Sequence, residues 1–244
     1  MALPPDASLE ELIHDPAPEI LIAVAADQRL PEDLALALLN RRDLPREALE
    51  ELNRNSSVAK QRRVRLAIVM HPHTPRHVAV PTIRHLYTFE LMQVALLPAV
   101  AADVKRAAEE VLIGRLTSIT SGERFTLAKQ SSGRVAAALL LDKEERILQA
   151  ALNNPQMTEM HVVKALKAEA GTELLAPAVA RHQKWLYRND VKAALLANKN
   201  TPLGRAVQIA NELPLKVLKD VLHNSRLAPN IRAHVMGVLE KRGK

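Results

Sequence analysis

The stretch HPHTPRHVAVPTIRHLYTFELMQVALLPAVAADVKRAAEEVLIGR, residues 71–115, returns in altered form as NKNTPLGRAVQIANELPLKVLKDVLHNSRLAPNIRAHVMGVLEKR, residues 198–242. The same offset of 127 aligns residues 20–116 with residues 147–243 without a gap, and 19 of the 97 aligned pairs are identical. Self-similarity at a fixed spacing is typical of repeat proteins, in which each unit buries its apolar face against the next. The duplication therefore predicts an extended surface rather than one enclosed cleft.

The composition indicates a globular chain with an aliphatic interior. Of the 244 residues 48% are hydrophobic, but only one Trp, two Tyr and two Phe are present. Sheet-rich folds usually contain more aromatic and Thr-rich strands, so the interior should consist of Leu, Ala and Val on helix faces. The absence of cysteine excludes disulfides and thiolate chemistry and fits a reducing compartment.

The N-terminal sequence MALPPDASLEEL has neither the basic nor the apolar region of a secretion signal. No apolar run approaches the roughly 20 residues of a membrane helix, so we expect a cytoplasmic protein with no membrane partner. Charge is unevenly distributed: residues 1–50 hold 4 Lys/Arg and 11 Asp/Glu, whereas the rest of the chain holds 30 and 16. One end is acidic and the body is basic.

Apolar residues recur at spacings of three and four between prolines and small polar residues, which predicts short helices. Pro31, Pro45 and the Thr-Pro pairs at 74–75 and 201–202 mark helix starts, and we expect both Thr hydroxyls to cap first-turn amides. About sixteen helices are expected. The clearest are at residues 18–26, 32–41, 45–54, 58–70, 88–97, 101–115, 143–153, 158–169, 173–181, 189–197, 201–213, 214–223 and 229–242.

Residues 117–135, between the two copies, carry a helical pattern and are expected to form a further helical unit rather than a linker. The alternative is a hinge around Ser131–Gly133. Helices this short gain stability by stacking on their neighbours. The fold prediction is therefore an all-α, right-handed α-solenoid of about eight helix pairs, internally duplicated and forming a single domain over residues 1–244.

The Thr-Pro helix starts, each followed by helix, turn and helix with Leu, Val and Ala faces, resemble those of the bacterial HEAT-like and leucine-rich-repeat-variant α-solenoids. As architecture, the resemblance covers nearly the whole chain. It implies a binding scaffold and names no substrate. With it we expect no enzymatic activity and no cofactor.

A concentration of cations lies in the stretch from Leu52 to Phe89, which contains no Asp or Glu. The second copy keeps this only in part, because Arg62 faces Asn189 and Arg63 faces Asp190. Cations spaced along a solenoid could contact phosphates, but long basic side chains also form ordinary solvated helix faces. The candidate partner-binding set, called here the basic stripe, is Arg54, Lys60, Arg62, Arg63, Arg65, Arg181 and Lys192.

Three histidines, His71, His73 and His77, invite a metal-site interpretation, because clustered imidazoles bind zinc or nickel. In the second copy, Asn198 and Asn200 occupy the first two positions. Both His and Asn suit turns and helix starts. We therefore predict structural turn residues and no metal site.

Trp185 is followed by Tyr187, Arg188 and Asp190, a set that resembles the active surface of the HEAT-like DNA glycosylases. Val58 occupies the aligned position in the first copy, which favours a packing role for Trp185. The chain contains no phosphate-binding loop, dinucleotide fingerprint, zinc-protease motif or nucleophile elbow. We therefore expect that the chain has no enzymatic activity.

The sequence thus predicts a non-enzymatic scaffold that binds a protein or peptide, acidic in character, on its concave surface. The alternative is a nucleic-acid binder of the HEAT-like type that contacts the phosphate backbone, whose affinity would fall steeply with salt. Scarce aromatics argue against base stacking by single strands. The sequence does not select an oligomeric state.

Overall fold

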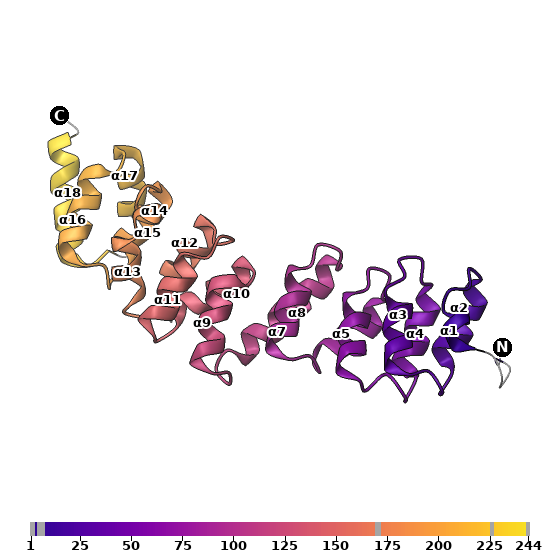
Figure 1. Cartoon of the computed structure of the whole chain (residues 1–244). Helices are drawn as coiled ribbons and strands as arrows, with labels where there is room; N and C mark the ends of the chain where they lie inside the picture. Colours follow the sequence, from indigo (N-terminus) through magenta and orange to yellow (C-terminus); the bar gives the residue numbers. More distant parts are fainter. Residues whose placement is uncertain (1–2, 4–7, 169–171, 225–226, 243–244) are drawn as a thin grey trace. The chain divides into compact units, whose positions relative to one another are not determined.

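The computed structural model describes residues 3, 8–168, 172–224 and 227–242. Over these residues the chain forms eighteen α-helices and one short 3-10 turn, with no strand (Figure 1). The all-α prediction is confirmed. The chain divides into two compact units, residues 1–117 (unit 1) and residues 118–244 (unit 2). Within the described ranges, no helix combines the length and apolar character needed to cross a bilayer.

Unit 1 is a succession of short helices, each of which packs mainly on the next two along the chain. Helix α2 packs against α4, α3 against α5, α5 against α6 and α7, and both α6 and α7 against α8. The helices are α1 (Leu9–Leu12), α2 (Pro18–Ala26), α3 (Glu32–Leu39), α4 (Arg46–Arg54), α5 (Arg62–Met70), α6 (Arg76–Ile83), α7 (Thr88–Leu96) and α8 (Ala102–Arg115).

Unit 2 repeats this scheme, with α9 against α11, α10 against α12, α15 against α17 and α16 against α18. Helix α12 packs against α15 across two short helices. The helices are α9 (Ser121–Gln130), α10 (Gly133–Ala138), α11 (Glu145–Leu152), α12 (Glu159–Lys167), α13 (Leu175–Arg181), α14 (Gln183–Leu186), α15 (Asn189–Ala197), α16 (Leu203–Glu212), α17 (Leu215–Asn224) and α18 (Pro229–Arg242). The 3-10 turn spans Leu139–Leu141.

The cores are aliphatic, as the composition predicts. In unit 1, Leu38, Leu49 and Ile68 are fully buried, and in unit 2 Leu148 and Leu195 are fully buried. Each of these side chains lies on the apolar face of an amphipathic helix, where spacings of three and four positions bring apolar residues together. Each unit therefore has its own hydrophobic interior.

The prolines mark helix starts as predicted: Pro31, Pro45, Pro75 and Pro202 stand immediately before α3, α4, α6 and α16. Proline suits this place because its fixed φ is compatible with entry into a helix and its missing N–H has no intrahelical partner to lose. All four occupy the N-cap position, and none of these four helices has a side-chain cap.

The predicted capping role of the two threonines is wrong. Thr74 donates its hydroxyl hydrogen to the carbonyl of Ile68, and Thr201 donates to the carbonyl of Leu195 at 2.6 Å. Both acceptors lie in the preceding helix, six positions earlier. Because the proline takes the N-cap position, each threonine stands one residue too early to reach the first-turn amides of the next helix.

The segment between the copies is helical, since α9 occupies most of it. At the conceivable hinge, Ser131 is buried and its carbonyl accepts a hydrogen bond from Asn154 Nδ2 at 3.1 Å. Gly133 packs so closely that an added Cβ would lie 2.3 Å from the carbonyl oxygen of Gln156. The segment is thus packed within unit 2, and the two units divide after Thr117.

Candidate functional site

A repeated asparagine joins successive helix pairs. Asn55, Asn154 and Asn198 each donate from Nδ2 to a backbone carbonyl 26 to 32 positions earlier, at 2.7–2.9 Å. Each also accepts a hydrogen bond at Oδ1 from the backbone N–H two residues later. His71 takes the same place, with Nε2 2.8 Å from the Arg41 carbonyl and Nδ1 3.2 Å from the following N–H group.

The histidine segment therefore has the structural role that the duplication predicts. His71 Nδ1 accepts and Nε2 donates, so its neutral form is satisfied, and burial lowers the pKa of the ring. His73 Nδ1 lies 3.2 Å from the Leu44 carbonyl, and His77 lies beside Glu50 at 3.2 Å. In the part of the chain that the structure describes, no group of three or more His, Asp or Glu side chains could hold a metal ion.

Two identical arginines, Arg115 and Arg242, hold the C-terminal ends of α6 and α16. Each guanidinium donates to a pair of carbonyls that are two residues apart, and the two pairs are related by the offset of the duplication. Arg242 also makes a long contact of 3.5 Å with the Ala210 carbonyl. The acceptors are Arg84 and Leu86 (2.7 and 2.6 Å) for Arg115, and Asn211 and Leu213 (2.8 and 3.0 Å) for Arg242. Identity between the copies at these positions thus reflects packing.

Two cations of the basic stripe in unit 1 are engaged with their own neighbourhood. Arg54 pairs with Glu51 at 2.7 Å and with Glu50 at 3.8 Å, both on α4. Arg65 donates from Nε to the Ala59 carbonyl at 3.0 Å. These two side chains form a solvated and partly structural surface rather than an uncompensated positive one.

The two members of the basic stripe in unit 2 are also paired. Arg181 donates to Glu145 at 3.0 Å. Lys192 lies 2.7 Å from Glu212 with its side chain only 14% exposed, and this hydrogen bond lowers the pKa of Glu212. Arg181 and Lys192 are therefore compensated by carboxylates of unit 2.

The remaining members, Lys60, Arg62 and Arg63, gather at the start of α5. The predicted helix over 58–70 begins only at Arg62, so Lys60 lies in the preceding turn, exposed and without a hydrogen bond or ion pair to any described residue. Arg63 is 69% exposed and lies 3.9 Å from Glu32 and 3.8 Å from Asp33, which are long separations for ion pairs. This end of α5 carries the least compensated positive charge of the basic stripe.

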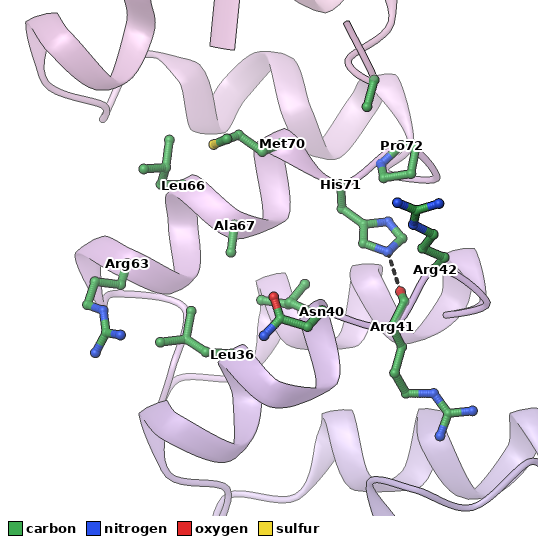
Figure 2. A pocket seen from close by; sticks show the side chains of 12 residues that line it. Leu36, Asn40, Arg41, Arg42, Arg63, Leu66, Ala67, Met70, His71 and Pro72 are labelled. Carbon is green, nitrogen blue, oxygen red and sulfur yellow. Dashed lines mark hydrogen bonds between the residues drawn. The ribbon is translucent and has the colours of Figure 1, made fainter. Parts of the chain in front are cut away.

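A groove of about 700 Å³ lies between α3 and α5, and we call it the α3/α5 groove (Figure 2). Arg63 stands at one end of it, and Arg41 and Arg42 stand at the other. Arg41 pairs with Asp43 and donates to two carbonyls in the connection between α1 and α2. Arg42 is exposed and has no partner among the described residues. The apolar part of the lining is Leu36, Leu39, Leu66, Ala67, Met70, Pro72 and Ala99.

The residues that line the α3/α5 groove are only partly kept in the second copy. Asp190 stands in the second copy where Arg63 stands in the first, and alanines replace Leu66 and Met70 at 193 and 197. The buried turn residues and carbonyl-binding arginines recur in both copies, but this cation and these long apolar side chains do not. The shared turn residues and arginines are therefore needed by the repeat itself, whereas Arg63, Leu66 and Met70 are particular to unit 1.

A second feature, the Arg62–Tyr87–Glu90 cluster, joins α5 to α7. Arg62 donates from Nε to Glu90, and its guanidinium lies over the Tyr87 ring, 4.4 Å from the centroid. The Glu90 side chain is only 7% exposed and also accepts the Tyr87 backbone N–H at 2.8 Å. The sequence gives no sign of this cluster, because Glu90 lies just outside the acid-free stretch and 28 positions from Arg62.

Trp185 fills an interior position, as its alignment with Val58 predicts. Its side chain is buried and Nε1 donates to the Leu152 carbonyl at 3.1 Å. Tyr187 and Asp190, in contrast, are exposed. The tryptophan ring is therefore part of the packing of unit 2 and is not available to stack on a ligand beside them.

No protein-family model, no curated protein and no solved structure matches this chain. The surfaces particular to this molecule are the α3/α5 groove and the Arg62–Tyr87–Glu90 cluster.

Proposed function

We propose that this chain is a non-enzymatic scaffold, a right-handed α-solenoid of about eight helix pairs, that binds an acidic amphipathic segment of a protein or peptide. The sequence duplication, the short helices and the packing of each helix on the next two support the solenoid. The recurring asparagines and arginines support it as well, because they tie each helix pair to the preceding one.

The α3/α5 groove is the observation that carries the proposal. Its apolar floor suits one or two aliphatic side chains of a partner helix, and Arg42 and Arg63 at opposite ends suit carboxylates on the flanks of that helix. A partner with the opposite charge pattern would be repelled. Successive helices of a solenoid line its concave side, so we assign the groove to that side.

Arg63 is well suited to exchange partners. Its present contacts with Glu32 and Asp33 are long and solvent-exposed, and exposed pairs of this kind contribute only about 0–1 kcal/mol. A carboxylate of the partner could replace them at little cost. Aliphatic contacts on the groove floor would then supply most of the affinity.

The test is fluorescence anisotropy with a labelled amphipathic helical peptide that has leucines on one face and glutamates beside them. We expect Arg42→Glu to weaken binding about tenfold or more. The substitution replaces an attractive contact with a carboxylate of the peptide by repulsion between two carboxylates, which costs well over about 1 kcal/mol. Lys164→Glu, on the exposed face of α12 in unit 2, makes the same change in net charge and should leave binding intact.

A peptide in which lysines replace the glutamates is the second control, and it should not bind. Equal binding of both peptides, or equal weakening by Arg42→Glu and Lys164→Glu, would show that the α3/α5 groove does not select an acidic partner.

A further inference from the structure

The Arg62 guanidinium is held in a fixed orientation with its outer nitrogens unused. Buried Glu90 accepts a hydrogen bond from Arg62 Nε, and the Tyr87 ring lies beneath the guanidinium group. Glu90 is itself held in place by a hydrogen bond from the Tyr87 backbone N–H. Neither Nη atom has a partner among the described residues. The two free NH2 groups of a planar, pre-oriented guanidinium match two oxygens of a phosphate group.

The Tyr87 ring offers an open face beside this guanidinium. Arg62 covers one face at 4.4 Å, yet Tyr87 remains 61% exposed, which leaves room for a base to stack on the side of the ring away from Arg62. Phe89, two residues later, is 42% exposed. Aromatic side chains on a basic surface are stacking platforms for nucleobases, each with a substantial contribution to affinity.

The scarcity of aromatic residues does not argue against stacking once their positions are known. Trp185 alone is buried among the described aromatic residues, whereas both tyrosines and both phenylalanines are at least 38% exposed. The core is built from aliphatic residues, so the few Phe and Tyr side chains lie at the surface. Arginine lies beside two of these rings, Arg62 over Tyr87 and Arg146 near Phe125 at 5.8 Å.

The charges around the cluster favour a polyanion. Among the described residues, the only carboxylate in contact with Arg62 is Glu90, and the two charges compensate each other. Lys60, in the turn before α5, and Arg84, three residues before Tyr87, are exposed, and their side chains have no partner among the described residues. A strand of nucleic acid presents phosphates at regular intervals to such cations.

We infer that the Arg62–Tyr87–Glu90 cluster is a nucleotide subsite for single-stranded nucleic acid. A base stacks on the open face of Tyr87, and an adjacent phosphate accepts hydrogen bonds from the two Nη atoms of Arg62. An acidic peptide would satisfy the guanidinium but would leave both Tyr87 and Phe89 exposed, whereas a nucleotide engages the ring and the cation together. A duplex hides its base faces and would use only the cations.

This subsite is separate from the α3/α5 groove. Arg62 and Arg63 are consecutive on α5 and therefore point about 100° apart around the helix. Arg63 lines the groove, whereas Arg62 faces α7. The inference goes beyond the proposed function, and either can fail while the other holds.

The experiment is fluorescence anisotropy of the full chain with a labelled single-stranded oligonucleotide of about 16 nucleotides, the upper end of typical site sizes. Titrations run at about 50 and 200 mM salt, since phosphate contacts weaken steeply over that range. We expect binding that falls with salt, a loss of about tenfold for Tyr87→Ala, and near wild-type affinity for Tyr87→Phe, which keeps the ring. Arg62→Lys, which keeps the charge but loses the fork of donors, should also weaken binding.

Three outcomes would overturn the inference. One is equal affinity for the strand and for a duplex of the same sequence, and another is equal affinity of the wild type and Tyr87→Ala. The third is an acidic peptide that binds in a Tyr87-dependent way while the strand does not bind, which would assign the cluster to a protein partner. Circular dichroism of Tyr87→Ala and Arg62→Lys establishes that both variants are folded, and Arg42→Glu compared with Lys164→Glu shows whether the groove takes part.

Discussion

His71 and Asn198 show how two chemically different residues perform one task. Each places a donor on a carbonyl of the preceding helix pair and accepts the N–H two residues later. The imidazole can do so only in its neutral form, because its acceptor nitrogen must be unprotonated. A residue that looks like a metal ligand in the sequence is thereby committed to a turn, and it makes the turn sensitive to pH.

We predict that His71→Asn reduces the loss of stability on acidification. Burial lowers the pKa of His71, so below about pH 6.5 the unfolded chain binds a proton that the folded chain resists. The contribution of neutral His71 to the stability of the fold is complete above that pH, and it is lost as the pH falls toward the lowered pKa. Asparagine keeps both hydrogen bonds and does not titrate.

Urea unfolding of the wild type and His71→Asn at pH 7 and pH 5 measures this difference. The free energy of unfolding of the variant should match that of the wild type at pH 7 to within about 1 kcal/mol. At pH 5 it should be higher than that of the wild type. The same pH dependence in both proteins would show that the ring is not held neutral.

Two glycines of unit 2 should respond in opposite directions to alanine. At Gly133 the new Cβ would meet the backbone oxygen of Gln156 at 2.3 Å, and the backbone must shift. Overpacking of this kind costs about 1–3 kcal/mol. At Gly122, in the first turn of α9, nothing lies within 4 Å of the new atom, so stability should be unchanged or should rise by up to about 1 kcal/mol. The free energies of unfolding from denaturant titrations test the pair, and equal effects would contradict the close packing at Gly133.

At the scale of the helix, the C-terminal ends of α6 and α16 are secured by arginines from later helices. Arg115 on α8 satisfies two carbonyls at the end of α6, and Arg242 on α18 does the same for α16. Short helices have few internal hydrogen bonds in proportion to their unsatisfied ends, so such contacts weigh heavily. The elements are thus stabilised mostly by their neighbours.

We predict that Arg115→Ala lowers the free energy of unfolding by about 2–3 kcal/mol, because it removes two charge-assisted hydrogen bonds from carbonyls at a helix end. Arg106→Ala on the exposed face of the same helix should change it by less than about 0.5 kcal/mol. Thermal or urea unfolding of the two variants gives the comparison, and a similar loss in both would indicate an effect of charge or helix propensity alone.

At the scale of the whole molecule, the chain divides after Thr117 into two compact units with separate aliphatic interiors. The sequence predicts a single domain, because the copies and the segment between them read as one series of helices. The boundary falls one residue beyond the end of the first copy, and the segment between the copies packs with unit 2. This division makes the single-domain prediction testable by dissection.

We expect fragments 1–117 and 118–244 each to show helical circular dichroism and a cooperative melt, because each corresponds to a compact unit with buried aliphatic residues of its own. Division at residue 132 should yield less stable fragments, because it separates buried Ser131 from Asn154, to which it is hydrogen-bonded. Unfolded fragments from the division at 117, alongside a folded full chain, would show that the two units depend on each other and would support one continuous domain.

Local regularities in the sequence determined the helical class, the duplication, the aliphatic interior and the helix starts at prolines. These follow from spacings of three and four residues and from a fixed φ, which act within a few residues of each other. Tertiary structure alone decided which cations are compensated. Arg62 meets Glu90 from 28 positions away, and Arg42 and Arg63 come to opposite ends of one groove only when α3 packs against α5. Such pairings depend on how helices stack, and a local pattern contains no information about the carboxylate or ring that a cation will meet.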